Sequence, residues 1–148
     1  MELQMINLSG NSISKVWRQH GYICKRQPKF LCENEIWCLQ HMYHSGYVPF
    51  VQDRINEDTI IMEDLGKGEK IINRDVFMAH LERILRSLKL HGIRHGDLTE
   101  PNIIVRNDIP YIIDFAESRL LDDPRPDKRP EGDEYWLKKT MQKLCAKI

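Results

Sequence analysis

The sequence has no apolar run long enough to cross a membrane. No segment approaches the roughly 18 consecutive apolar residues that a spanning helix needs. The first residues, MELQMINLSGNS, also do not combine a charged start with an apolar stretch, as a secretion signal would. We therefore expect neither a membrane-spanning nor a secreted protein, but a cytoplasmic one with no membrane partner.

An excess of charge of one sign is also missing. Lys and Arg number 22, and Asp and Glu number 22, so the formal net charge is zero. The overall charge therefore does not indicate a nucleic acid or an anionic membrane as a partner. Lysines still give the last predicted helix a basic side, which suits a solvated face and, alternatively, an RNA or partner contact: Lys138, Lys139, Lys143 and Lys147.

Closely paired cysteines are absent as well. The four cysteines include no C-x-x-C pair, which argues against a zinc ribbon or a redox dithiol and favours reduced thiols. Cys38, His41 and His44 have a spacing that would allow them to share a metal ion. No fourth ligand can be assigned to them, so we prefer an ordinary helix end with partly exposed histidines.

The first 65 residues have the pattern of strands with one helix. Short apolar runs between turn residues predict strands up to residue 26, with His20-Gly21 as a hairpin turn. Apolar spacing predicts a helix over residues 30–43, which Ser45-Gly46 ends. The runs YVPFVQDRI and DTIIMEDL, joined by Asn56-Glu57-Asp58, predict a second hairpin.

The second half of the sequence has a helical pattern interrupted by one hairpin. A helix is predicted between Asn73, a candidate N-cap, and Gly92. Its apolar stripe consists of Val76, Phe77, His80, Leu81, Ile84, Leu85 and Leu88. The runs NIIV and YIID predict a hairpin around RNDIP. Residues 117–133 are predicted as an exposed loop, followed from Glu134 by an amphipathic helix with Asp133 as its cap.

The loop HGDLTEPN holds the strongest chemical signal. Asp97 and Asn102 stand five residues apart in it, ahead of an apolar run. A kinase catalytic loop has this spacing, with an Asp that takes the proton of the acceptor hydroxyl and an Asn that holds magnesium. The predicted hairpin would bring Asn102 and Asp114 to the same end of two strands. Their oxygens are the ligand type that Mg²⁺ prefers.

Two further residues match the needs of phosphoryl transfer. Lys25 ends the strand YICK, from which its ammonium group could reach nucleotide phosphates. Glu35, in the helical run ENEIWCL, could pair with Lys25, and Glu33 is the less favoured alternative. Each residue alone has an ordinary structural explanation. All of them in the required order, on the predicted strand, helix, loop and hairpin, are hard to obtain by accident.

These residues resemble the protein-kinase-like superfamily over residues 5 to 118. HGD in place of H-R-D, and CKRQPKF after the strand that carries Lys25, resemble its small atypical branch, the RIO kinases and the kinase subunit of the KEOPS tRNA-modification complex. The resemblance implies an α+β bilobal fold. Residues 1–148 would form one minimal kinase-like domain, with a strand-rich N-lobe over about 1–64 and a shortened helical C-lobe over about 69–148.

The resemblance also implies a function. The chain would be a phosphotransferase that uses ATP and Mg²⁺, either a serine/threonine-type atypical protein kinase or an autokinase or ATPase. Lys25 and Glu35 would position the phosphates, Asp97 would orient or deprotonate the acceptor, and Asn102 and Asp114 would hold the metal. A protein partner or substrate, and RNA contact through a larger complex, are implied as well.

Residues for the rest of the nucleotide follow from the same resemblance. Ser9, Gly10 and Asn11 occupy the place of the glycine-rich loop over the phosphates, with serine and asparagine where glycines are usual. Met62, Glu63 and Leu65 would border the adenine.

Two alternative functions stay open. Aminoglycoside phosphotransferases share the H-G-D-x-x-x-x-N loop, so a small-molecule kinase is one of them. The other is a non-catalytic binding module with a kinase-like fold. Only 34 residues follow Asp114, too few for the helices on which a peptide substrate docks in ordinary protein kinases.

Overall fold

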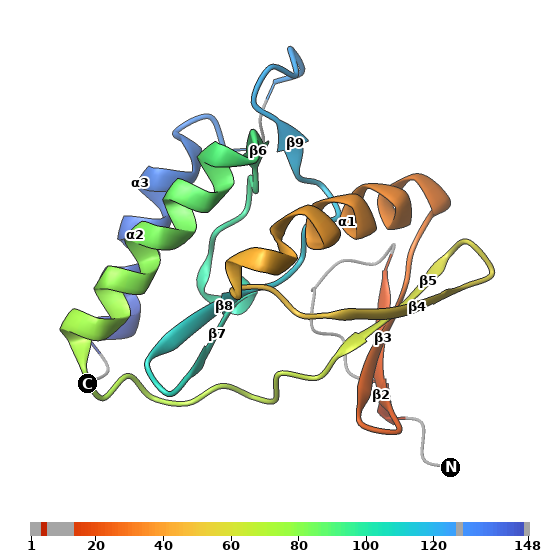
Figure 1. Cartoon of the computed structure of the whole chain (residues 1–148), viewed down its shortest axis with the longest axis horizontal. Helices are drawn as coiled ribbons and strands as arrows, with labels where there is room; N and C mark the ends of the chain where they lie inside the picture. The colour runs from red at the N-terminus through yellow and green to blue at the C-terminus, as the bar shows by residue number, and fades with distance from the viewer. Residues whose placement is uncertain (1–3, 6–13, 127–128, 147–148) are drawn as a thin grey trace.

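The computed structural model describes residues 4–5, 14–126 and 129–146. Its N-terminal lobe is a five-stranded antiparallel sheet in the order β1-β2-β3-β5-β4 (Figure 1). The strands are β1 (Gln4–Met5), β2 (Lys15–Gln19), β3 (Tyr22–Arg26), β4 (Val51–Ile55) and β5 (Thr59–Glu63). In the central strand β3, Lys25 is paired with Val16 of β2 and with Ile60 of β5.

Both predicted hairpin turns of this sheet are present. His20 and Gly21 have φ of 52° and 80°, and Asn56 and Glu57 have φ of 55° and 65°. Two successive residues with positive φ give a tight turn whose twist suits a pair of antiparallel strands. The turn residues noted in the sequence therefore fix the register of β2 with β3 and of β4 with β5.

Helix α1 (Lys29–Met42) packs against β4 and β5 and ends in a short 3₁₀ helix, η1 (Tyr43–Ser45). Gly46 follows with φ of 80°, so the predicted helix and its end are confirmed. The buried face of α1 consists of Leu31, Cys32, Glu35, Cys38, Leu39 and Met42. Glu35 is a carboxylate within this apolar face, and such a group needs close partners.

The C-terminal lobe is reached by an extended segment that leads from β5 to α2 (Arg74–Leu90) (Figure 1). The side chain of Asn73 accepts a hydrogen bond from the amide of Val76 at 3.1 Å, which confirms the predicted N-cap. Phe77, Leu81, Ile84 and Leu88 form the buried stripe. Val76 is 41% exposed, so its predicted place in the stripe is wrong. It precedes Phe77 by about 100° of rotation and lies outside that stripe.

Short strands and one more helix complete this lobe. β6 (Ile93–Arg94) pairs with β9 (Arg119–Leu120), and β7 (Ile103–Arg106) pairs with β8 (Ile109–Ile112) as the predicted hairpin. The 3₁₀ helix η2 (Glu100–Asn102) precedes β7, and α3 (Gly132–Cys145) packs against α2 (Figure 1). Buried apolar side chains of α1, β5, α2, β7, β8 and α3 form one cluster that joins the lobes.

Two predictions for residues 117–133 are wrong. The segment is not an exposed loop throughout, because Ser118 is 2% exposed and donates a hydrogen bond to the carbonyl of His95 at 3.0 Å, just before β9. Asp133 does not cap α3, which begins at Gly132. Its carboxylate accepts hydrogen bonds from the HGD loop instead. Within the described ranges, no helix combines the length and apolar character that crossing a membrane requires.

Candidate active site

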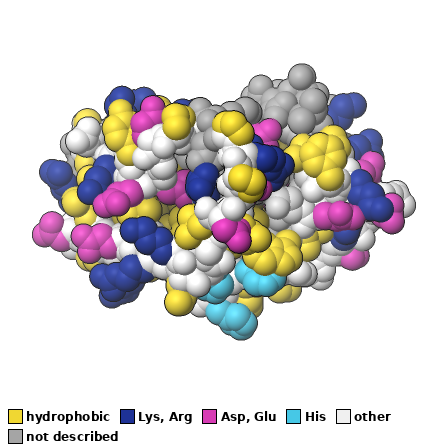
Figure 2. Space-filling view, turned by 90° about the horizontal axis from the view of Figure 1, so that it is seen from above, with side chains coloured by type: hydrophobic (Ala, Val, Ile, Leu, Met, Phe, Trp, Pro, Cys, Tyr) yellow, Lys and Arg dark blue, Asp and Glu magenta, His cyan; other side chains and the backbone are white. Residues whose placement is uncertain are grey.

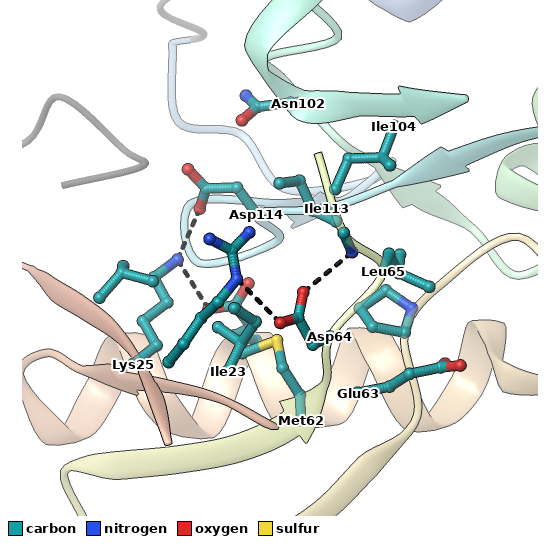
Figure 3. A pocket seen from close by; sticks show the side chains of 15 residues that line it. Ile23, Lys25, Met62, Glu63, Asp64, Leu65, Asn102, Ile104, Ile113 and Asp114 are labelled. Atoms are coloured by element: carbon teal, nitrogen blue, oxygen red, sulfur yellow. Dashed lines mark hydrogen bonds and ion pairs between the residues drawn. The ribbon is translucent and has the colours of Figure 1, made fainter. Parts of the chain in front are cut away.

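A cleft separates the sheet from the β7-β8 hairpin. Lys25, Asp114 and Asn102 line one end of it, and Met62, Glu63 and Leu65 line the other (Figure 3). The space between them, open to solvent on one side, amounts to about 560 Å³. Mainly apolar walls with a few polar groups at one place are typical of a site for a small organic ligand. Of the polar residues singled out in the sequence, Lys25, Glu35, Asn102 and Asp114 therefore line one cavity. Asp97 adjoins it through its hydrogen bond with Asn102.

Lys25 forms the centre of the polar end. Its Nζ is 2.9 Å from Oε1 of Glu35 and 2.9 Å from Oδ1 of Asp114, and its side chain is 6% exposed. Burial alone would lower the pKa of Lys25, but the two carboxylates outweigh it and raise that pKa above the ordinary value. Lys25 is therefore a fixed cation that joins β3, α1 and the segment after β8.

Glu35 is the carboxylate that orients Lys25. Its Oε1 also accepts a hydrogen bond from Nε2 of Gln27 at 2.9 Å, and its Oε2 accepts one from the amide of Phe115 at 2.8 Å. Glu35 is 1% exposed, whereas the side chain of Glu33 is 52% exposed and pairs with Lys29 and Arg54. Of the two acids considered from the sequence, the structure thus brings Glu35 to Lys25.

The HGD loop is held by two hydrogen bonds to Asp133, a residue more than 35 positions later in the sequence. The amides of His95 and Gly96 donate to Oδ2 and Oδ1 of Asp133, at 2.7 and 2.9 Å. His95 Nδ1 accepts from the amide of Asp97 at 3.1 Å, so Nε2 carries the proton and donates to the carbonyl of Ile113 at 2.9 Å. Gly96 has φ of 87°, where a side chain would be strained.

Asp97 has one partner on each carboxylate oxygen. Nδ2 of Asn102 donates to Oδ2 at 3.0 Å and to the carbonyl of Asp97 at 2.9 Å. Nε of Arg129 donates to Oδ1 at 2.9 Å, and its guanidinium lies 4.4 Å from the ring centre of Trp136. The Asp97 side chain is 46% exposed, so it stays accessible to another molecule from outside the protein.

Asn102 and Asp114 suit a divalent cation. Both Nδ2 hydrogen bonds of Asn102 go to Asp97, which leaves Oδ1 as the group that Asn102 offers to the cleft. The amide of Ile113 donates to the carbonyl of Asn102 at 3.0 Å, so the segment before β7 is fastened to the one after β8. Figure 3 shows both side chains at the same end of the cleft. Carboxylate and carboxamide oxygens match the preference of Mg²⁺.

Asp114 is held ionised by its surroundings. Burial would raise its pKa, but the Lys25 ammonium beside it outweighs burial and lowers that pKa below the ordinary value. The backbone at Asp114 has φ of 64°, in the left-handed region that Asp tolerates better than most residues. The chain turns sharply there, which directs the carboxylate towards Lys25.

The other end of the cleft is mainly apolar and borders the segment between the lobes. Met62 is 6% exposed and lines the cleft with Ile23, Ile104 and Ile113. Leu65 is buried, and Glu63 turns its side chain out to accept from the amide of Phe50 at 3.2 Å. Ser9, Gly10 and Asn11, predicted over the phosphates, lie outside the described residues.

The alternative metal ligands from α1 do not come together. Cys38 is buried, and burial raises the pKa of its thiol to about 12, which disfavours the thiolate that a metal requires. His41 stacks on Trp37 at 3.8 Å between ring centres. The described residues contain no group of three or more His, Cys, Asp or Glu side chains arranged around a common point.

Comparison with known proteins assigns the family. A family model described as the RIO domain matches residues 16–133, which is most of the chain. The chain belongs to the RIO domain family. All the described polar residues of the cleft, from Arg18 to Asp114, and the supporting Arg129 and Asp133 lie within the RIO match.

Sequence relatives agree with the RIO assignment. The chain is 34% identical over 80 residues to a probable bifunctional tRNA threonylcarbamoyladenosine biosynthesis protein of Methanocorpusculum labreanum, covering 53% of this chain and 15% of that one. It is 39% identical over 70 residues to a probable serine/threonine-protein kinase BUD32 homolog of Archaeoglobus fulgidus, covering 46% and 35%. The matches thus span well under half of each relative's length. The predicted resemblance to atypical kinases of the RIO and KEOPS type is confirmed.

The fold is also that of a RIO kinase. The Rio2 kinase of Chaetomium thermophilum superposes with a TM-score of 0.71 and 16% identity, over 95% of this chain and 57% of that one. At this identity the likeness shows the fold alone. The predicted α+β bilobal kinase-like fold is confirmed, with the strand-rich sheet and α1 forming one lobe.

Sequence reasoning missed several residues of the site. Arg18 and Ile23 line the cleft from β2 and β3, and strand alternation with Val16 and Lys25 could have found them. Arg129 and Asp133 reach the HGD loop across more than thirty residues of sequence. No local pattern marks such long-range contacts.

Proposed function

We propose that the chain is a phosphotransferase that depends on Mg²⁺ and ATP, a serine/threonine-type atypical protein kinase that acts on itself or a partner, or an ATPase within a complex. The observation that carries the proposal is the Lys25, Glu35 and Asp114 cluster beside Asp97 and Asn102, at one end of a mainly apolar cleft. Membership of the RIO family supports it. As part of the proposal, residues 1–148 act as one domain.

The proposed roles follow from what each group can do. Triphosphate oxygens would lie at the polar end, where Lys25 is held as a cation by Glu35 and Asp114. The accessible carboxylate of Asp97 would orient an acceptor hydroxyl and take its proton as the γ-phosphoryl group is transferred. Adenine would lie between Met62 and Ile104, with the backbone of Glu63 and Leu65 beside it.

Asn102 and Asp114 would hold Mg²⁺ through their oxygen atoms. The fit rests on the orientation of Asn102, whose amide nitrogen is committed to Asp97. Magnesium, when bound with the nucleotide, neutralises phosphate charge during transfer. Because phosphoryl transfer depends mainly on positioning and charge, a preformed cluster of this kind suits it.

A protein partner is part of the proposal. The M. labreanum relative is named for tRNA threonylcarbamoyladenosine biosynthesis and as bifunctional, which supports a protein partner and RNA contact through a larger complex. Figure 2 shows basic and acidic side chains interspersed on the face that it presents. A partner on this face would therefore meet mixed charges.

The test is the transfer and release of labelled γ-phosphate from Mg-ATP by the purified chain. Asp97→Asn and Asp114→Ala serve as variants, and Asp53→Asn in the exposed part of β4 as the control. We expect label on the protein or as free phosphate, lost in both variants and kept in the control. Phosphate transfer only to an added small molecule would favour the small-molecule kinase. No turnover, with no rise in melting temperature on adding ATP, would leave a binding module.

A further inference from the structure

The end of the cleft that is proposed to bind adenine contains a cation that the proposed roles do not use. Arg18 lines the cleft together with Val16, Ile23 and Lys25. Val16 is paired with Lys25, and Arg18 with Ile23, in the register of β2 and β3. Side chains of cross-strand pairs lie on the same face of a sheet. The two pairs therefore form the roof of the cleft, with Arg18 about 7 Å beyond Val16 along the strand.

Asp64, the residue after β5, holds the guanidinium of Arg18. Nε of Arg18 is 2.8 Å from Oδ2 of Asp64, and the two side chains are 23% and 18% exposed. Oδ1 of Asp64 accepts a hydrogen bond from the amide of Gly66 at 2.9 Å, which ties this carboxylate to its own turn (Figure 3). Among the described residues, Asp64 is the ion-pair partner of Arg18.

This position lies beside the backbone proposed to recognise the base. Asp64 stands between Glu63 and Leu65, and the opposite wall of the cleft consists of Ile104 and Ile113. A flat ring between the walls would have isoleucine side chains on one face. Its other face would meet Ile23 and the Arg18 side chain. A guanidinium is planar and stacks well on aromatic rings.

We propose that Arg18 is a nucleotide-recognition residue that stacks its guanidinium on the purine base, with Asp64 holding it in place. The inference rests on the proposed function, because it takes the cleft to bind ATP. It assigns to Arg18 a contact with the base and not with the phosphates. An isolated ion pair near the surface would contribute little by itself, whereas a stacked guanidinium adds affinity for the base.

The experiment measures dissociation constants by calorimetry for three probes: Mg-ATP, adenosine, which lacks phosphates, and tripolyphosphate, which lacks the base. Arg18→Met keeps an apolar side chain and removes the guanidinium, and Arg18→Lys keeps the charge without the plane. Arg26→Met is the matched control, since Arg26 lies over Trp17, which alternates with Val16 and Arg18 and so faces away from the cleft. Circular dichroism checks that each variant is folded.

We expect Arg18→Met to weaken the binding of adenosine and of Mg-ATP by the same factor, about tenfold. The binding of tripolyphosphate should not change. Arg18→Lys should lose most of the same affinity, and Arg26→Met none. If Arg18→Met weakened the binding of Mg-ATP and tripolyphosphate but not that of adenosine, Arg18 would be a phosphate ligand and the inference would be wrong. Tighter adenosine binding by Arg18→Met would overturn it too, because Arg18 would then obstruct the cleft.

The same measurements separate this inference from the proposed function. Wild-type protein that binds adenosine through Arg18 but neither transfers nor releases phosphate would refute the phosphotransferase and keep the recognition residue. If the wild-type protein turned over ATP, and Arg18→Met changed neither the rate nor the affinity for ATP, the phosphotransferase would stand and the recognition residue would be refuted. If the wild-type protein bound neither adenosine nor ATP, the inference and the proposed nucleotide site would both be wrong.

Discussion

Arg129 and Asp97, 32 residues apart, form an ion pair next to the cleft residue Asn102. The guanidinium is held a second time by Trp136, over whose ring it lies. The ion pair occupies one oxygen of Asp97 while Asn102 occupies the other. Because each carboxylate oxygen has two lone pairs, an acceptor hydroxyl still has a place to donate. Arg129 thus restricts the orientation of Asp97 without covering it.

Replacing Arg129 by Met should lower turnover about tenfold, because a catalytic carboxylate that is free to rotate spends less time in the productive orientation. The KM for ATP should stay unchanged, since Arg129 does not line the nucleotide cleft. Steady-state kinetics of phosphate release measures both. Arg125→Met is the control, because Arg125 is 67% exposed and pairs with Asp123. A faster Arg129→Met variant would contradict the prediction, because the ion pair would then hold Asp97 in an unproductive orientation.

The Arg129 contact also shows what a sequence alone can predict. Turns such as His20-Gly21 and the N-cap Asn73 were predictable because their geometry depends on neighbouring residues. The order of Lys25, Glu35, Asp97 and Asn102 was recognisable because it matches a known catalytic pattern. The contact between Arg129 and Asp97 depends on how α3 packs against the loop, which no local pattern encodes.

Glu35→Gln should destabilise the protein by about 3 kcal/mol, because it leaves the buried Lys25 with Asp114 as its remaining carboxylate. Glu33→Gln, two residues earlier on the exposed side of α1, should change stability by less than about 0.5 kcal/mol. Urea denaturation of both variants measures the difference. Equal effects would show that the contacts of Glu35 with Lys25, Gln27 and Phe115 contribute nothing beyond those of a surface acid.

Asp133→Asn should lower the free energy of unfolding by about 2 kcal/mol and should remove most of the turnover. The carboxylate accepts from the amides of His95 and Gly96 with separate oxygens, whereas an amide side chain would present one NH₂ group to an amide donor. Glu134→Gln is the control, since Glu134 pairs with Lys138 at the exposed start of α3. Denaturation and phosphate release together test the prediction. Full activity with lowered stability would limit Asp133 to a structural role.

The misassignment of Asp133 has a physical cause. An acidic residue in the first turn of a helix usually stabilises that end, and Asp133 is indeed in the first turn of α3. The sequence could not reveal that two amides of the HGD loop would compete for the same carboxylate. Ser118 was misjudged for the same reason, since its burial depends on the carbonyl of His95.

The contribution of Asp114 to stability should depend on pH in a defined direction. Its pKa in the folded protein lies below the ordinary 3.8, so the folded protein favours the charged form more than the unfolded chain does. This stability is fully present above pH 3.8 and is lost as the pH falls through the folded pKa. Lys25 has a pKa above its ordinary 10.5, so its share is lost only as the pH rises above that value.

The measurement compares the free energy of unfolding of the wild type with that of Asp114→Asn across pH. The difference should be constant between about pH 5 and pH 9, where both groups are charged in both states. It should shrink below pH 3.8, because the carboxyl of the unfolded chain takes up a proton there while that of the folded protein is still charged. A difference that stays constant down to pH 2 would show that the charge of Asp114, and hence its ion pair with Lys25, does not stabilise the fold.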